Sequence, residues 1–180
     1  MKAADTWARE IRERYQKLYG AGHLSLSKNY SDKFPLLEHV LKDAVRGRIV
    51  LDFGCGPGRL ALMLARCGRE VHGVDYAGEG IELAGLLARA AEAENAAFSE
   101  GDLAWVTAQG RRYDVIVLAG VLEHLEQPLD QLRALAALLT PGGLLCVQCP
   151  SRALATVWRL LVDRAFPHRK FCCLPVRAVL

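Results

Sequence analysis

Three alternating glycines directly after a short apolar run constrain this chain more than any other feature. Residues 49–51 read Ile-Val-Leu, and residues 52–58 read Asp-Phe-Gly-Cys-Gly-Pro-Gly. This pattern predicts a buried strand that turns into a helix, because glycine lets the backbone bend sharply and approach a ligand closely. In open α/β sheets, ligands bind beyond the carboxyl ends of the strands. The spacing therefore predicts a nucleotide-like cofactor at this turn.

Short apolar runs alternate with helical patterns along most of the chain. Such alternation predicts an α/β fold with a doubly wound, Rossmann-like parallel sheet in the order 3-2-1-4-5. The helical stripes before residue 47 predict an N-terminal extension, 1–46, that packs on a core of residues 47–151. The expected strands are 49–51, 71–74, 96–99, 115–118 and 144–147, and the expected helices are 7–19, 36–45, 60–67, 81–93 and 129–139.

The glycine turn admits two kinds of cofactor. Residues 56–61 fit the loose G-x-G-x-x-G/A pattern of dinucleotide-binding proteins, which on its own is weak. A dinucleotide would place its pyrophosphate at the helix N-terminus, where Asp52 would face a like charge. S-adenosylmethionine (SAM) has no phosphate and carries an ammonium and a sulfonium, which suit a carboxylate. The charges favour SAM, and a nicotinamide-dependent oxidoreductase stays the alternative, because Asp52 could point away.

Further motifs follow the glycine turn in order and with ordinary spacing. Asp75 and Tyr76 follow the second expected strand, and Asp102 and Leu103 follow the third. Together with the glycine turn, the fourth strand and its loop, and a Thr-Pro-Gly-Gly turn, they make five motifs within residues 48–151. In this order the motifs resemble those of the class I SAM-dependent methyltransferases.

The resemblance implies SAM as the cofactor and S-adenosylhomocysteine (SAH) as its product. In that family the acidic residue at Asp75 holds the ribose hydroxyls, and the one at Asp102 contacts the adenine amino group. The motif style, above all residues 121–125, is similar to the small-molecule branch that includes ubiquinone-biosynthesis O-methyltransferases. A small-molecule methyl acceptor is therefore expected, and no motif for methylating nucleic-acid bases occurs. The residues expected at the cofactor are Asp52, Gly54, Cys55, Gly56, Gly58, Asp75, Tyr76, Asp102, Leu103, Ala119 and Gly120.

His124 is the candidate catalytic residue. It follows the fourth expected strand, and its imidazole could take a proton from a hydroxyl nucleophile. The competing interpretation is that His124 only orders the loop or lines the pocket. The neighbouring Glu123 is interpreted as an acidic residue at a helix start. His168 and Tyr30 could cover the site, or they could be an exposed tail histidine and an ordinary core or surface tyrosine.

The chain departs from the family after its fifth strand. The family normally continues into an antiparallel hairpin, whereas only about 30 residues follow Ser151 here. We expect residues 152–180 to form a lid helix, 153–166, and a truncated segment. Strand 144–147 is then the last strand of the sheet, and its edge is either open or covered by a partner chain or by residues 171–180. A SAM-binding module without catalysis is therefore a second hypothesis. The basic residues of this segment with Trp158 could touch an anionic membrane surface, or form a solvated face of the lid.

Composition excludes several classes of protein. The net charge of +3 predicts no dedicated nucleic-acid surface. The first residues have no apolar core for a signal peptide, and no apolar run reaches the roughly 18 residues of a membrane span. A cytoplasmic protein is expected, with no metal. The six cysteines are interpreted as reduced and mostly buried thiols, because residues three apart on a strand, such as Cys146 and Cys149, point to opposite faces.

Overall fold

The computed structural model describes residues 41–149 and, for the backbone alone, 170–175. A sheet of six strands forms the centre, in the order β3-β2-β1-β4-β5-β6, and every pair of neighbours is parallel. The elements are β1 (Ile49–Phe53), α4 (Arg59–Ala65), β2 (Glu70–Asp75), α5 (Gly78–Ala90), β3 (Ala96–Glu100), α6 (Leu103–Ala108), β4 (Tyr113–Ala119), the 3-10 helix η1 (Leu122–His124), α7 (Pro128–Ala137), β5 (Leu139–Cys149) and β6 (Lys170–Pro175).

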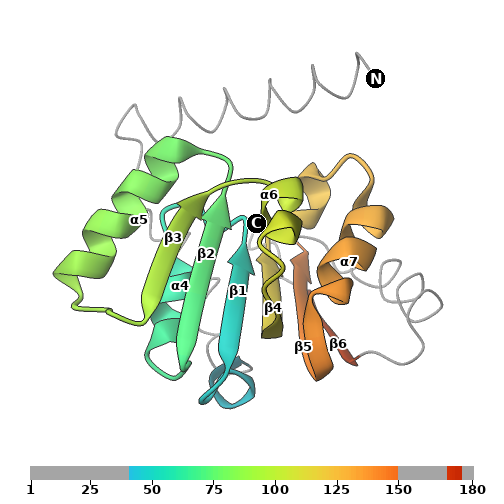
Figure 1. Cartoon of the computed structure of the whole chain (residues 1–180), viewed down its shortest axis with the longest axis horizontal. Helices are drawn as coiled ribbons and strands as arrows, with labels where there is room; N and C mark the ends of the chain where they lie inside the picture. The colour runs from blue at the N-terminus through green and yellow to red at the C-terminus, as the bar shows by residue number, and fades with distance from the viewer. Residues whose placement is uncertain (1–40, 150–169, 176–180) are drawn as a thin grey trace.

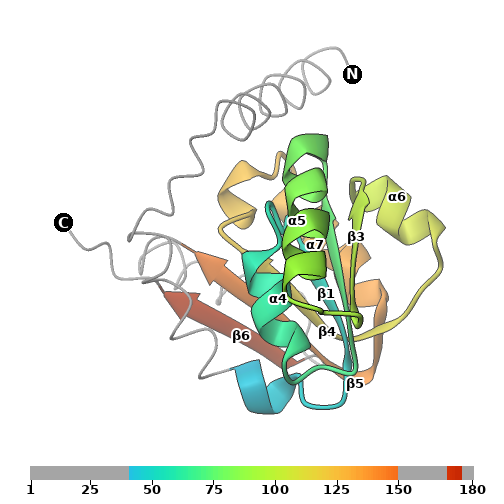
Figure 2. The ribbon, with the colours of Figure 1, turned by 90° about the vertical axis from the view of Figure 1, so that its left-hand side faces the viewer.

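Helices cover both faces of the sheet, with α4 and α5 on one face and α6 and α7 on the other (Figures 1 and 2). Each face has its own hydrophobic core. Val50 of β1 packs with α4 residues such as Leu64, and Leu51 packs with α7 residues such as Leu135. Successive strand residues point to opposite faces, so uniformly apolar strands are what a sheet covered on both sides requires. The doubly wound α/β prediction is confirmed.

The predicted count of five strands is wrong, because the sheet has six. Strand β6 pairs with β5 from Leu144↔Lys170 to Cys149↔Pro175, which agrees with the alternative that the last residues of the sequence cover β5. The short apolar run of β6, residues 171–174, lies beyond the five expected strands. Strand β5 also begins earlier than expected, at Leu139. A register shift lets it pass the Pro-Gly-Gly turn and pair again from Leu144 onward.

Helix α6 is a further element that the hydrophobic pattern did not predict. Asp102 is its N-cap residue, and the Asp102 Oδ1 accepts a hydrogen bond from the Trp105 backbone N–H at 2.9 Å. Trp105 and Val106 then pack into the core on the α7 side. The expected helices 7–19 and 153–166 lie outside the described residues, as does most of 36–45, of which residues 41–44 are helical.

Candidate functional site

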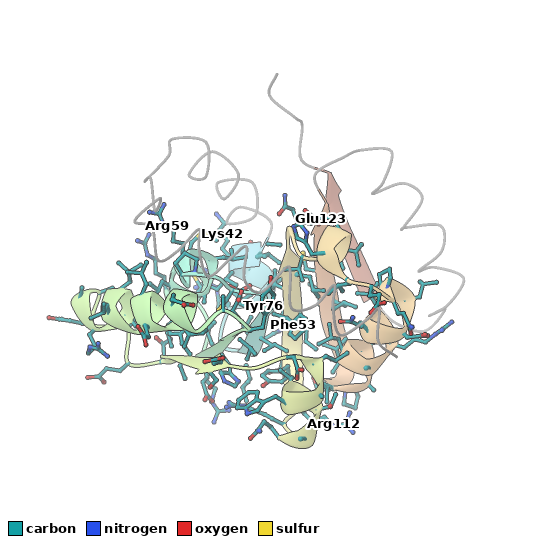
Figure 3. The ribbon with its side chains drawn as sticks, turned by 90° about the horizontal axis from the view of Figure 1, so that it is seen from above. Lys42, Phe53, Arg59, Tyr76, Arg112 and Glu123 are labelled. Atoms are coloured by element: carbon teal, nitrogen blue, oxygen red, sulfur yellow. The ribbon has the colours of Figure 1, made fainter. Side chains whose placement is uncertain are left out.

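A cavity of about 550 Å³ opens at the carboxyl ends of β1 and β2 and runs between α6 and α7. Figure 3 looks onto these strand ends, where the labelled Phe53 and Tyr76 lie near each other. Six residues expected at the site line the cavity: Gly54, Asp75, Tyr76, Asp102, Leu103 and His124. The other expected residues, which do not line it, are Asp52, Cys55, Gly56, Gly58, Ala119 and Gly120.

The glycine turn is held by its own backbone hydrogen bonds. The N–H groups of Gly54 and Cys55 both donate to the Val74 carbonyl, at 2.7 and 3.1 Å. The Gly56 N–H donates to Asp75 Oδ2 at 2.8 Å, and the Gly58 N–H donates to the Cys55 carbonyl at 3.0 Å. Since proline has no N–H, every N–H between residues 54 and 58 already has a partner.

Packing as well as backbone conformation requires glycine at this turn. Gly54 and Gly58 both have φ of 75°, in the left-handed region. A Cβ on Gly54 would lie 2.4 Å from a Val121 methyl, and one on Gly58 would lie 2.6 Å from the Phe98 ring. The sequence predicted close approach to a ligand at these positions. The structure adds close approach to neighbouring side chains.

Asp75 is the buried carboxylate at the mouth of the cavity. Besides the Gly56 N–H on Oδ2, it accepts the Ala77 N–H on Oδ1 at 2.9 Å. Burial raises the pKa of Asp75 above its ordinary value, and the backbone hydrogen bonds act in the opposite direction. The Tyr76 backbone N–H is a third donor to this carboxylate. A carboxylate has about four acceptor sites, so Asp75 can still accept a hydroxyl from a ligand.

Asp52 lies deeper, on the α4 side of the sheet. It is 1% exposed, and its face follows from alternation along β1, since Val50 packs with α4 and Leu51 with α7. The Asp52 carboxylate accepts the Ala61 backbone N–H, while its buried Oδ2 has no hydrogen-bond partner among the described residues. Burial, followed by the nearby Asp75 carboxylate, raises the pKa of Asp52 to about 7. The side chain thus points away from the cavity that Phe53 lines.

The remaining expected residues have structural partners of their own. The Cys55 thiol donates to the Gly56 carbonyl at 3.5 Å, and burial raises the pKa of this thiol. Ala119 packs toward α4 at the end of β4. Gly120, with φ of 69°, donates its N–H to the Gln148 carbonyl at 3.1 Å. These residues shape the turn and the loop after β4.

His124 reaches the cavity from η1, and its backbone N–H donates to the Val121 carbonyl at 2.9 Å. The neighbouring Glu123 is exposed and is labelled in Figure 3. Thr107 of α6 and Gln131 and Ala134 of α7 also line the cavity, and sequence reasoning missed all three. An unpredicted helix carries the first, and the other two looked like ordinary positions of an amphipathic helix.

Several sequence predictions fall on residues that the structure does not describe: Tyr30, Trp158, His168 and the basic residues between 152 and 169. Within the described part of the chain, Cys55, Cys67 and Cys146 are unbridged, and no three metal-binding side chains cluster. No helix there has the length and apolar character that crossing a membrane requires.

Comparison with known proteins gives one family. A family model described as a methyltransferase domain matches residues 11–178. The chain is 38% identical over 105 residues to the ubiquinone biosynthesis O-methyltransferase of Bordetella avium, covering 57% of this chain and 43% of that protein. It is 36% identical over 131 residues to the enzyme of the same name from Xanthomonas campestris, covering 69% and 54%. The chain thus spans about half the length of these relatives.

Solved structures agree with this family. Magnesium protoporphyrin IX methyltransferase from Synechocystis with bound SAM superposes with a TM-score of 0.56 at 25% identity, covering 76% of this chain and 70% of that one. The DhpI–SAM–HEP complex superposes with a TM-score of 0.64 at 19% identity, covering 87% and 71%, and shows the shared fold.

Proposed function

Because the chain belongs to the methyltransferase domain family, we propose that it transfers a methyl group from SAM to a small-molecule acceptor. The curated relatives are named O-methyltransferases, so a hydroxyl is the acceptor group that we infer. The cofactor would supply an activated methyl group on a sulfonium. The protein's task is then chiefly to hold the nucleophile and the methyl group in line.

The observation that carries this proposal is that the backbone N–H groups of the glycine turn already donate hydrogen bonds within the protein. A dinucleotide needs free backbone N–H groups at this turn for its pyrophosphate. Here the N–H groups of residues 54–58 donate to Val74, Asp75 and Cys55 instead, which leaves a pyrophosphate only the first N–H groups of α4, those of Arg59 and Leu60. Two buried carboxylates, Asp52 and Asp75, add negative charge beneath the turn. This arrangement disfavours a pyrophosphate and suits a cationic ligand without phosphate, as SAM is.

The residues around the cavity fit the parts of SAM. We propose that Asp75 accepts the ribose hydroxyls and that Tyr76 packs beside them at the strand end. Asp102 is proposed to accept from the adenine amino group, with Leu103 against the base. Asp52, whose buried Oδ2 has no partner among the described residues, lies beneath the turn, and a bound ammonium would favour its charged form through space rather than by contact. Gly54, Cys55, Gly56, Gly58, Ala119 and Gly120 are proposed to form the backbone surface around the methionine portion.

His124 is the proposed general base. It lines the cavity from the loop after β4, and an imidazole can accept a proton near neutral pH. Replacing it by glutamine should lower the rate of S-adenosylhomocysteine formation with phenolic acceptors by about 10²-fold, without weakening cofactor binding. An unchanged rate would assign His124 to pocket lining alone.

The test of the binding proposal is calorimetric titration of SAM, SAH and NAD, with Asp75→Ala beside the wild type. SAM and SAH should bind, NAD should not, and the substitution should weaken SAH binding by about tenfold or more, since a hydrogen bond to a charged group contributes about 1.5–3 kcal/mol. Asp43→Ala is the matched control, because Asp43 is exposed and, among the described residues, pairs with Arg46 at the surface. Binding of NAD alone would overturn the proposal.

A second candidate function is SAM binding without catalysis. The chain spans about half the length of the curated relatives, so methyl transfer is tested separately from cofactor binding. SAH binding that is never accompanied by methyl transfer to any phenol would support this candidate over the enzyme.

A further inference from the structure

One wall of the cavity lies outside the methyltransferase motifs. Thr107 of α6 and Gln131 and Ala134 of α7 line the same cavity as Asp75, Asp102 and Leu103. If the ribose is held at Asp75 and the base at Asp102 and Leu103, this α6–α7 wall faces the base.

Gln131 is the half-buried polar side chain of this wall, whereas Thr107 is exposed. The single Thr107 hydroxyl proton is shared between the Leu103 and Ala104 carbonyls, at 2.9 Å each. The Gln131 side chain makes no hydrogen bond to any residue in the described ranges, 41–149 and 170–175. The surrounding walls, which include Ala134, Val121 and Leu125, are apolar. An amide without a partner among the described residues, in such a setting, is suited to hydrogen-bond a bound ligand.

We propose that Gln131 selects the adenine base of the cofactor through the edge that carries N7 and the exocyclic amino group. A glutamine amide offers a donor and an acceptor side by side, which match adenine N7 and N6 in a bidentate pair. The amino group has two hydrogens, so Asp102 and Gln131 can each accept one. This inference rests on the proposed function, because it assumes that the cavity takes SAM.

The experiment compares SAH with its 7-deaza analogue, which lacks the N7 acceptor, by calorimetric titration. The wild type should bind the 7-deaza analogue about 3- to 10-fold more weakly, the loss expected for one hydrogen bond. Gln131→Met, which keeps the length of the side chain and its helix propensity, should bind both ligands equally. Gln131→Glu should also lose the preference, because its carboxylate can accept from the amino group but cannot donate to N7.

Gln127→Met is the matched control, because Gln127 lies on the exposed start of the same helix and does not line the cavity. It should keep the wild-type preference, and thermal unfolding should show that all variants are folded. If the wild type binds SAH and Gln131→Met still discriminates against the 7-deaza analogue, the role of Gln131 is wrong while the proposed function stands. If the folded wild type binds neither ligand, both are wrong.

Discussion

Asp52 and Asp75 lie near the carboxyl ends of the neighbouring strands β1 and β2, but their carboxylates differ in hydrogen bonding. Asp75 accepts the Gly56 and Ala77 N–H groups at 2.8 and 2.9 Å, whereas Asp52 has a buried oxygen without a partner among the described residues. Burying a carboxylate without full hydrogen bonding costs free energy, and the proton-bound form is favoured as a result. Asp52 is therefore a position where the free protein sacrifices stability at neutral pH.

Asp52→Asn should stabilise the ligand-free protein at high pH. The folded-state pKa of about 7 lies above the ordinary value of 3.8, so the folded protein binds more protons between about pH 4 and 7. The free energy of unfolding should then fall as pH rises through this window, and the variant should lack that fall. At pH 8 the variant should be more stable by about 2–4 kcal/mol, measured by urea unfolding. Parallel pH profiles for wild type and variant would contradict this account, and Asp43→Asn serves as the exposed control.

At the scale of elements, three strands are tied together beneath α6 by a buried polar cluster. His72 of β2 contacts the Tyr113 hydroxyl of β4 at 3.0 Å and the Ser99 hydroxyl of β3 at 3.1 Å, and Trp105 of α6 meets its ring edge-on. Burial, and then the charge of Arg111, lower the pKa of His72 below 6.5. This cluster fixes the sheet surface on which α6 rests.

Tyr113→Phe should destabilise the fold by about 1–2 kcal/mol, because one nitrogen of a buried imidazole loses its partner. A lowered folded-state pKa means that the unfolded chain binds more protons below pH 6.5. The His72 contribution is thus present above pH 6.5 and is lost as pH falls. Chemical unfolding at pH 8 and pH 5.5 checks both statements. Equal stability of Tyr113→Phe and the wild type at pH 8 would mean that the cluster is not energetically coupled.

Helix α6 allows the two roles given to Asp102 to be separated. Asp102→Ala should remove both the cap and the proposed adenine contact, which would lower stability by about 1 kcal/mol and also weaken SAH binding. Asp102→Ser keeps a good N-cap residue but shortens the side chain. It should retain stability while SAH affinity falls, as urea unfolding and calorimetry would measure. If Asp102→Ser bound SAH as tightly as the wild type does, Asp102 would be a helix cap and not an adenine contact.

Sequence reasoning succeeded where one physical signal dominated. The apolar runs predicted β1 and β4, and the glycine turn predicted the strand-to-helix connection after β1. These features were enough to predict the doubly wound sheet. It failed where a residue has two roles or where a short segment lies outside the repeating pattern. Asp102 was interpreted as a ligand contact and is also a helix cap, and the four-residue apolar run of β6 lies beyond the last expected strand. The direction of Asp52 was left open, although alternation from Val50 predicts the α4 side.

At the scale of the whole molecule, β6 decides how the sheet ends. With β6 in place, the carboxyl half of β5 pairs on both sides, to β4 and to β6. Without it, the apolar β5 would present an open edge, which invites pairing between molecules. Strand β6 thus covers the edge of β5, and the paired residues Leu144 and Lys170 are 26 positions apart in the sequence.

Two consecutive prolines, at Phe171 and Cys172, should open that edge. One of two successive N–H groups on a strand faces its neighbour, so the double substitution removes a ladder hydrogen bond whichever way β6 is turned. Hydrogen exchange should accelerate in residues 144–149, and aggregation on heating should increase. Amides of β3, at the opposite end of the sheet, are the internal control. Unchanged protection of β5 would show that β6 does not pair with it in solution.

The strand order also has a consequence for the protein during its synthesis. The central strand β1 is complete at Phe53, but its second neighbour, β4, is complete only at Ala119. At about 5–20 residues per second, the ribosome needs roughly 3–13 s to add the 66 residues between them. Throughout that interval the buried strand β1 lacks its β4 neighbour. Nascent chains halted near residue 112 should therefore bind a chaperone more strongly than chains halted far enough beyond residue 119 for β4 to emerge, and equal binding would argue that the growing chain protects β1 by another route.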